Sequence, residues 1–234
     1  MFSRDLKAIV FDFDRTLAPL GNFVRWREAL PLMREHYQKK GVPEEYLDGA
    51  PRGCFGLYGH VGRGDHLSPE ELARTQQDVS EILARYEEVG IGRVELFAGA
   101  AELLRALPGM GLQAGIVSSN PRAVIEVVLR DEGVADCFGA VVGRDEVEQI
   151  KPLPEGMKRC CELLGVRPED CIGVGDNAGD IEASRAAGMP GVGVATGVSK
   201  PPELREAGAI EVFEDITAFH AALTQWQGSA DQAG

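Results

Sequence analysis

The chain has 234 residues, 44% of them hydrophobic and 26% charged, which is typical of a folded globular protein with one main domain and a smaller insertion. Its formal net charge of -13 repels the phosphates of nucleic acids and anionic lipids. The composition therefore argues against nucleic acid or a membrane surface as a partner.

The chain begins with charged residues before a very short apolar run, which cannot form the core of a signal peptide or a membrane span. Its five cysteines are an odd number and lack the C-x-x-C spacing of a zinc site or a disulfide framework. The four histidines likewise lack a metal-ligand spacing. These features predict reduced thiols and a cytoplasmic location.

Short apolar runs without polar alternation predict strands that are buried on both faces of a parallel sheet. These runs lie within residues 6–13, 113–117, 139–142, 171–174, 192–195 and 210–213. Helical patterns bounded by Pro or Gly separate the later runs, at residues 99–107, 121–132, 154–164, 180–187 and 215–227. The alternation predicts a doubly wound, Rossmann-like α/β core that binds ligands beyond the carboxyl ends of its strands.

Residues 17–95 interrupt this alternation and are predicted to form a helical cap. The first cap helix contains Pro31, which should kink or restart it. A second begins at Ser68, where Ser68 and Glu71 form a capping-box pattern. The glycine-rich stretch 49–64 between them is predicted to form an irregular loop. The insertion is expected to act as a lid, with an ordinary helical subdomain as the alternative.

These patterns predict the following division of the chain. The catalytic core comprises residues 1–16 and 96–227, the cap residues 17–95, and a flexible tail residues 228–234.

Four carboxylates lie at the ends of two predicted strands. Asp12 and Asp14 follow the first strand, two residues apart, so their side chains project on the same face. Asp176 and Asp180 follow the strand at 171–174. An isolated D-x-D could simply end a strand, but four acids at two strand ends suit a hard cation with oxygen ligands, such as Mg²⁺.

The second acidic segment also matches a relaxed dinucleotide fingerprint, G-x-G-x-x-A, at Gly173, Gly175 and Ala178. Asp176 argues against that alternative, because its carboxylate would face the pyrophosphate. No Asp or Glu lies near twenty residues downstream to bind a ribose hydroxyl.

Phosphate ligands need hydroxyl, amide or cationic groups, and this acidic chain must supply the cation locally. Ser118, Ser119 and Asn120 end the strand at 113–117, and Lys151 lies in a polar loop. Taken singly, each could be an ordinary surface residue. Their order between the two acidic segments makes them candidate phosphate-binding residues.

Taken together, the motifs resemble the haloacid dehalogenase (HAD) superfamily of phosphatases, over nearly the whole chain. Within the superfamily, they resemble in particular the branch of phosphoglycolate phosphatase, whose helical cap follows the first strand. The family's D-x-D-x-T, strand-end hydroxyl, lysine and G-D-x-x-x-D motifs match residues 12–16, Ser118, Lys151 and residues 175–180. Arg15 stands where capped members often have glycine. It could reach a substrate anion, pair with a cap acid or point to solvent.

The resemblance implies a covalent mechanism on a small phosphorylated metabolite. Asp12 would attack phosphorus and form an aspartyl-phosphate, and Asp14 would protonate the leaving alcohol and then activate water. Ser118 and Lys151 would hold the phosphoryl oxygens.

It also implies a magnesium cofactor. The ion would be held by Asp12, the backbone carbonyl of Asp14 and Asp176. Asp180 would act through water or by orienting Lys151.

The same motifs leave other activities open. An aspartate at position 14 favours oxygen-linked phosphate over dehalogenation, whereas a phosphosugar mutase would use the same pair of acids. From a different class, a receiver-like signalling domain or a non-catalytic phosphate-binding module would be the alternative. A receiver is disfavoured because its phosphoacceptor follows a later strand, and a silent module because no motif acid is missing.

Overall fold

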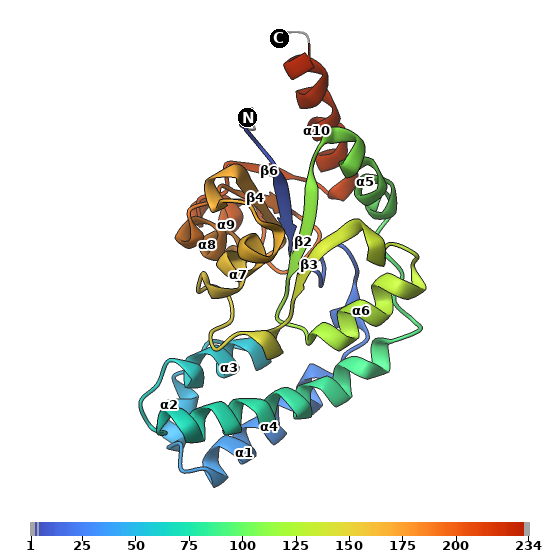
Figure 1. Ribbon diagram of the computed structural model, residues 1–234. Coiled ribbons are helices and arrows are strands. Elements are labelled where there is room, and N and C mark those ends of the chain that lie inside the picture. The colour runs from blue at the N-terminus through green and yellow to red at the C-terminus, as the bar shows by residue number, and fades with distance from the viewer. Residues whose placement is uncertain (1–2, 4, 232–234) are drawn as a thin grey trace.

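The computed structural model describes residue 3 and residues 5–231. Its centre is a parallel six-stranded sheet in the order β3-β2-β1-β4-β5-β6 (Figure 1). The strands are β1 (Ala8–Phe11), β2 (Gln113–Val117), β3 (Phe138–Val142), β4 (Cys171–Gly175), β5 (Gly191–Val194) and β6 (Glu211–Phe213). The predicted doubly wound α/β core is confirmed.

Helices cover both faces of the sheet (Figure 1). One layer holds α5 (Ala100–Ala106), α6 (Arg122–Asp131) and α10 (Ile216–Asp231), and the other holds α7 (Glu155–Leu164), α8 (Ala178–Ala187) and α9 (Pro201–Glu206). Alternate residues of β1 pack into different hydrophobic cores. Ile9 and Phe11 belong to one core, and Ala8 and Val10 belong to the other. Burial on both faces explains why this strand shows no polar alternation.

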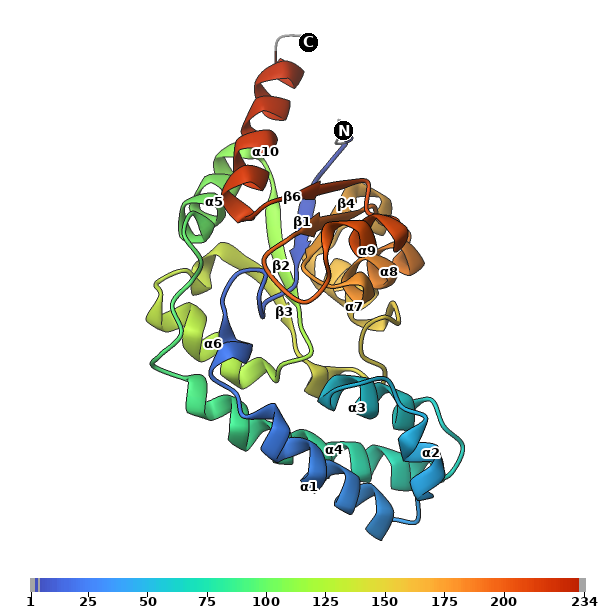
Figure 2. The same ribbon diagram turned by 180° about the vertical axis from the view of Figure 1, so that it is seen from behind.

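The cap consists of α1 (Trp26–Lys39), α2 (Glu44–Asp48), α3 (Cys54–Gly62) and α4 (Pro69–Glu87). Figure 2 shows α1 and α4 side by side in a separate body at one end of the sheet. The cap has its own hydrophobic core, centred on Met33, Tyr37 and Leu83. Its buried members come from residues 29–83, apart from Ile150 in the loop before Lys151. Leu17 and Val94, near the ends of the predicted cap, pack with the sheet instead.

One expectation for the cap is wrong, and a second is wrong in part. The glycine-rich stretch 49–64 is not irregular, because it contains α3. Glycines in α3 allow close packing: a Cβ at Gly56 would lie 2.5 Å from the backbone carbonyl oxygen of Pro51, and one at Gly62 would lie 2.9 Å from the amide nitrogen of Gln76 in α4. The first cap helix also continues through Pro31 without restarting. Buried Met33, beyond the proline, anchors it in the cap core.

At the C-terminus, α10 continues to Asp231, four residues beyond the predicted end of the helix. The expected flexible tail at residues 228–234 therefore falls partly on this helix. The rest of that tail, residues 232–234, lies outside the described residues.

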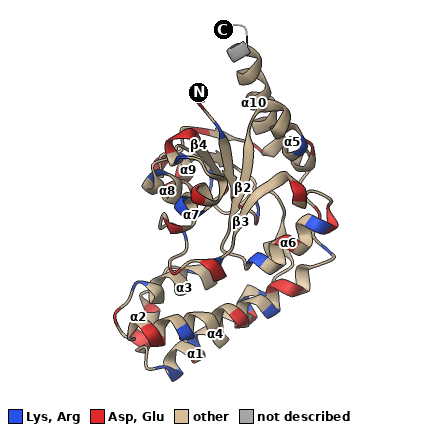
Figure 3. Ribbon diagram, in the orientation of Figure 1, with Lys and Arg blue, Asp and Glu red and all other residues tan. Residues whose placement is uncertain are grey.

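Charged residues lie mainly on helices and loops, whereas β2 and β3 carry none (Figure 3). Among the helices of the described residues, none combines the length and the apolar character needed to cross a membrane.

Candidate active site

The strand order reverses between β1 and β4, and the two main acidic motifs follow these two strands. From β1 the sheet extends through β2 and β3 on one side and through β4, β5 and β6 on the other. Asp12 follows β1, and its backbone N–H donates to the carbonyl of Val174 in β4 at 2.8 Å. In sheets of this kind, such a switch point is where ligands bind.

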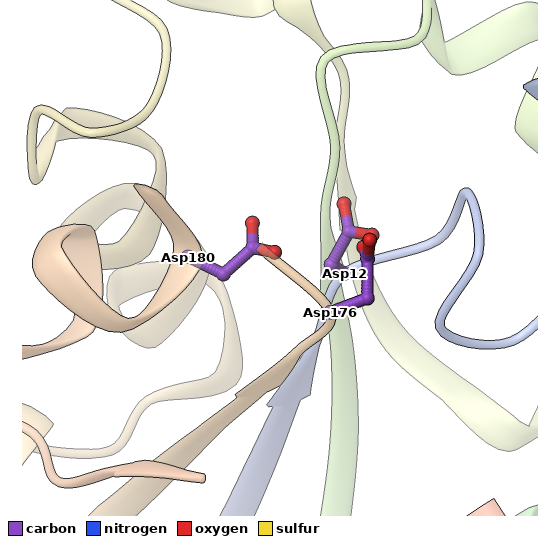
Figure 4. Close-up of side chains that lie close together, drawn as sticks. All are labelled: Asp12, Asp176 and Asp180. Carbon is purple, nitrogen blue, oxygen red and sulfur yellow. The ribbon is translucent and has the colours of Figure 1, made fainter. Parts of the chain in front are cut away.

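Asp12, Asp176 and Asp180 form a buried cluster, here called the acidic trio. Each can offer one carboxylate oxygen such that all three oxygens lie within 4.8 Å of one another. Figure 4 shows Asp180 reaching from α8 toward the other two, which rise from the strand ends. A Cβ at Gly175 would collide with the side chain of Asp180, so the motif glycine leaves room for this approach.

Lys151 is the cation beside the trio. Its Nζ donates to Asp12 Oδ1 at 2.6 Å and to the carbonyl of Val117 at 2.9 Å, and it lies 2.6 Å from Asp180 Oδ1. Burial alone would lower the pKa of Lys151, but the carboxylates of Asp12 and Asp180 outweigh burial and raise it. The lysine therefore stays charged.

The side chain of Asp12 is 8% exposed, and its carboxylate has partners on both oxygens. Oδ1 accepts from Lys151, and Oδ2 accepts from Thr16 Oγ1 at 3.1 Å. Burial raises the pKa of Asp12 well above its ordinary value. Lys151 opposes this rise, and the charges of Asp180 and Asp176 add to it.

Asp176 carries the clearest sign of charge crowding. Burial and then the charge of Asp180 raise its pKa to about 7, against the backbone N–H of Val198, which donates to Oδ2 at 2.7 Å. A Cβ at Gly197 would collide with this carboxylate, so the loop after β5 can close over Asp176 only with glycine there.

Asp14 is not part of the acidic trio. Its Oδ1 accepts from the backbone N–H of Gly21 at 2.7 Å, and its Oδ2 lies 4.0 Å from Arg15 Nε. Burial raises the pKa of Asp14, and the Gly21 N–H and the Arg15 charge oppose this rise. A Cβ at Gly21 would collide with the carboxylate, which explains the glycine in this turn.

The candidate phosphate-binding residues after β2, Ser118, Ser119 and Asn120, have different hydrogen-bond partners. Ser118 Oγ donates to Asn120 Oδ1 at 3.1 Å, and Asn120 Nδ2 donates to Glu87 Oε1 at 2.7 Å. The carbonyl of Ser119 accepts from Arg144. The Asn120 amide thus already has partners on both its oxygen and its nitrogen, and its position favours orienting Ser118 over contacting phosphate.

Arg144 and Glu87 form a buried ion pair that no sequence motif had indicated. Both side chains are 0% exposed, and Arg144 Nη1 donates to Glu87 Oε1 at 2.7 Å. Arg144 also donates to the hydroxyl and the carbonyl of Ser80 in α4, each at 2.8 Å. Together with Asn120, these contacts connect the cap helix α4 to the loop that carries Ser118. Glu87 Oε2 is buried and has no hydrogen-bond partner among the residues that the structure describes.

The comparisons with known proteins agree with this geometry. A family model described as haloacid dehalogenase-like hydrolase matches residues 6–188. A curated phosphoglycolate phosphatase from Rhodospirillum rubrum is 29% identical over 236 residues, which cover 97% of this chain and 93% of that protein.

Two solved structures share the fold. A hydrolase from Pseudomonas syringae has a TM-score of 0.67 at 23% identity, covering 94% of this chain and 98% of that chain. A protein assigned as beta-phosphoglucomutase from Thermotoga maritima has a TM-score of 0.62 at 22% identity, covering 94% and 99%. At these identities the likeness shows the fold alone.

The predicted resemblance to the phosphoglycolate phosphatase branch is confirmed, as is the predicted enzyme class, a HAD-like phosphatase. With a family match over most of the chain and the motif residues gathered at the switch point, this protein belongs to the haloacid dehalogenase-like hydrolases.

Proposed function

We propose that the protein is a magnesium-dependent phosphatase that hydrolyses a small phosphomonoester through an aspartyl-phosphate on Asp12. The observation that carries this proposal is the position of Asp12 at the switch point. There it is paired with Lys151 at 2.6 Å and lies within the acidic trio. A buried carboxylate that lies beside a fixed cation, within a cluster that could hold a metal ion, supports attack by Asp12 on an anionic phosphoryl group.

The residues present suit magnesium. The acidic trio offers oxygen donors only, and the raised pKa of Asp176, caused by burial and the charge of Asp180, indicates that a cation would relieve their repulsion. Asp12, Asp176 and the backbone carbonyl of Asp14 would hold the ion. Asp180, bonded to Lys151 and to the backbone N–H of Asn177, would orient the lysine. Bound magnesium would neutralise charge on the phosphoryl oxygens.

In the first chemical step, an Asp12 oxygen forms a bond to phosphorus while the bond from phosphorus to the ester oxygen breaks. Asp14 donates its proton to that oxygen, and burial, which raises the pKa of Asp14, favours the protonated form that this requires. In the second step Asp14 takes a proton from water as the water attacks phosphorus and frees Asp12. Lys151 and the hydroxyls of Ser118 and Ser119 hold the phosphoryl oxygens.

Asp14→Asn is expected to slow turnover by roughly 10²–10⁴-fold, because an amide can neither donate this proton nor accept one from water. Steady-state phosphate release as a function of pH measures the effect. The part of the pH–rate profile that reports the titration of Asp14 should also be lost in the variant. An unchanged rate and profile would assign Asp14 a structural role at Gly21.

Asp176→Asn is expected to stabilise the metal-free protein. In the fold the pKa of Asp176 is about 7, above its ordinary value of 3.8, because of burial and the charge of Asp180. Between these pH values the folded state keeps a proton that the unfolded chain has lost, so stability falls as pH rises through this window. Above about pH 7, Asp176 is charged in the parent, and removing this charge relieves about 1–2 kcal/mol of repulsion. The melting temperature of Asp176→Asn should therefore be about 2–8 °C higher than that of the parent.

Paired thermal melts in chelator and in magnesium, at several pH values, measure this. Magnesium at about a hundred times its dissociation constant should add about 2.7 kcal/mol to the parent. The variant should show a flatter pH dependence in chelator and a smaller magnesium shift. A variant that melts lower than the parent in chelator yet keeps the full magnesium shift contradicts the proposed metal site.

We propose a small phosphorylated acid of the phosphoglycolate type as substrate and the cytoplasm as location. The curated relative named phosphoglycolate phosphatase, aligned over 97% of the chain, supports the substrate class. Five cysteines without disulfides are consistent with the location.

A panel of phosphoglycolate, sugar phosphates and nucleoside monophosphates, assayed with magnesium and with chelator, tests the proposed function. Magnesium-dependent phosphate release from at least one ester is expected. Conversion of a sugar phosphate to its isomer without phosphate release would assign a mutase instead.

A further inference from the structure

Arg15 adopts a backbone conformation that arginine normally avoids. Its φ is +64°, and among the described residues it is the one non-glycine with a positive φ. A glycine would take this conformation without steric cost, whereas a side chain with a Cβ is strained there. Strain of this kind collects at functional sites, where the surrounding structure enforces it.

Hydrogen bonds on both sides fix the backbone of Arg15. Its N–H donates to the carbonyl of Ala18 at 2.6 Å, and its own carbonyl accepts from the hydroxyl of Thr196 in the loop after β5. With the backbone held, the side chain lies beside Asp14, with Nε 4.0 Å from Asp14 Oδ2. The charged group is thus next to the proposed general acid.

Among the described residues, the guanidinium of Arg15 has one charged partner, Asp14, at 4.0 Å. Within the part of the chain that the structure describes, it makes no hydrogen bond, and its side chain is 32% exposed. Lys151, the other cation beside the acids, is 9% exposed and bound to both Asp12 and Asp180. Arg15 therefore remains available, with its N–H donors, for an anion that comes from outside the protein.

The position of Asp14 indicates where that anion would lie. A general acid must come within hydrogen-bond distance of the leaving oxygen of the ester. A group on the next carbon of the substrate then lies one or two bonds beyond that oxygen, close to the neighbour of Asp14. A carboxylate there would match the planar fork of a guanidinium.

We propose that Arg15 binds a carboxylate on the carbon attached to the ester oxygen and so selects phosphorylated 2-hydroxy acids over neutral or cationic esters. The inference rests on the proposed function, because it takes Asp14 as the group next to the leaving oxygen. It explains why a strained arginine, rather than a glycine, follows Asp14.

Three esters of similar size and different charge test the proposal: phosphoglycolate, 2-hydroxyethyl phosphate and O-phosphoethanolamine. The parent should favour phosphoglycolate in kcat/KM. In Arg15→Gly the ratio of phosphoglycolate to 2-hydroxyethyl phosphate should fall roughly 10- to 100-fold, the worth of a charge-assisted contact. Arg15→Lys should retain an intermediate ratio, because it keeps the charge but loses the fork.

Arg15→Gly removes the backbone strain, so its melting temperature should not fall, and this checks that the variant is folded. Arg63→Ala, which removes an exposed cap arginine, is the matched control and should leave the substrate ratio unchanged. An equal loss on all three esters in Arg15→Gly, or a loss of preference in Arg63→Ala instead, overturns the assignment of Arg15 while phosphatase activity stands. A parent that releases phosphate from no ester rejects the proposed function itself.

Discussion

Asp12→Asn is expected to reduce phosphate release by on the order of 10⁴-fold or more, the scale seen when a catalytic nucleophile is removed. The amide has nearly the same shape as the carboxylate, but it cannot form an aspartyl-phosphate. It also loses the charge that pairs with Lys151 at 2.6 Å. Phosphate release under saturating substrate and magnesium measures the change.

The fold should survive this substitution. Asp180 still pairs with Lys151 at 2.6 Å, the amide oxygen can accept from Lys151, and the amide N–H can donate to the Thr16 hydroxyl. Burial disfavours the charged form of Asp12 and raises its pKa, so a neutral residue suits the site. The variant should therefore melt close to the parent. Turnover near that of the parent would exclude Asp12 as the nucleophile.

Arg144→Met is expected to cost about 3–5 kcal/mol of unfolding free energy, the usual effect of breaking a buried ion pair by removing one partner. Glu87 is 0% exposed and would be left as a buried carboxylate without its cation. Ser80 and the carbonyl of Ser119 would lose their donor as well. Urea unfolding measures the loss.

Two further variants separate the ion pair from the loss of a side chain. The double variant Arg144→Met with Glu87→Met leaves no buried charge, so it should be more stable than Arg144→Met alone. Arg122 is the matched control: it is 45% exposed and pairs with Glu126 at 2.6 Å. Arg122→Met should cost no more than about 1 kcal/mol. A double variant no more stable than Arg144→Met alone would mean that the unpaired charge of Glu87 is not the cause of the loss.

The local parts of the fold and site could be predicted from sequence. The run Ala8–Phe11 is apolar at every position because both faces of β1 are covered, and that pattern is visible in four residues. Asp12 and Asp176 meet because they end adjacent parallel strands, β1 and β4. Strand ends and short motifs are local features of the sequence, so the site could be predicted from them.

The remainder depended on contacts between distant segments. Arg144 and Glu87 are 57 positions apart, and neither belongs to a pattern that marks the other. The glycines of stretch 49–64 suggested flexibility, but a glycine that allows close helix packing looks the same in sequence as one that loosens a loop. The neighbourhood of Arg15 likewise required the observed backbone, since its φ of +64° cannot be read from residue type.

The most direct test of the account is to stop the reaction with acid during steady-state turnover and map any protein-bound phosphoryl group by peptide mass spectrometry. An acyl phosphate that hydroxylamine removes is expected on the peptide containing Asp12, only with magnesium and substrate present, and absent in Asp12→Asn. Rapid phosphate release with no phosphoryl group on the protein, or a phosphoryl group on a residue other than Asp12, would contradict covalent catalysis by Asp12.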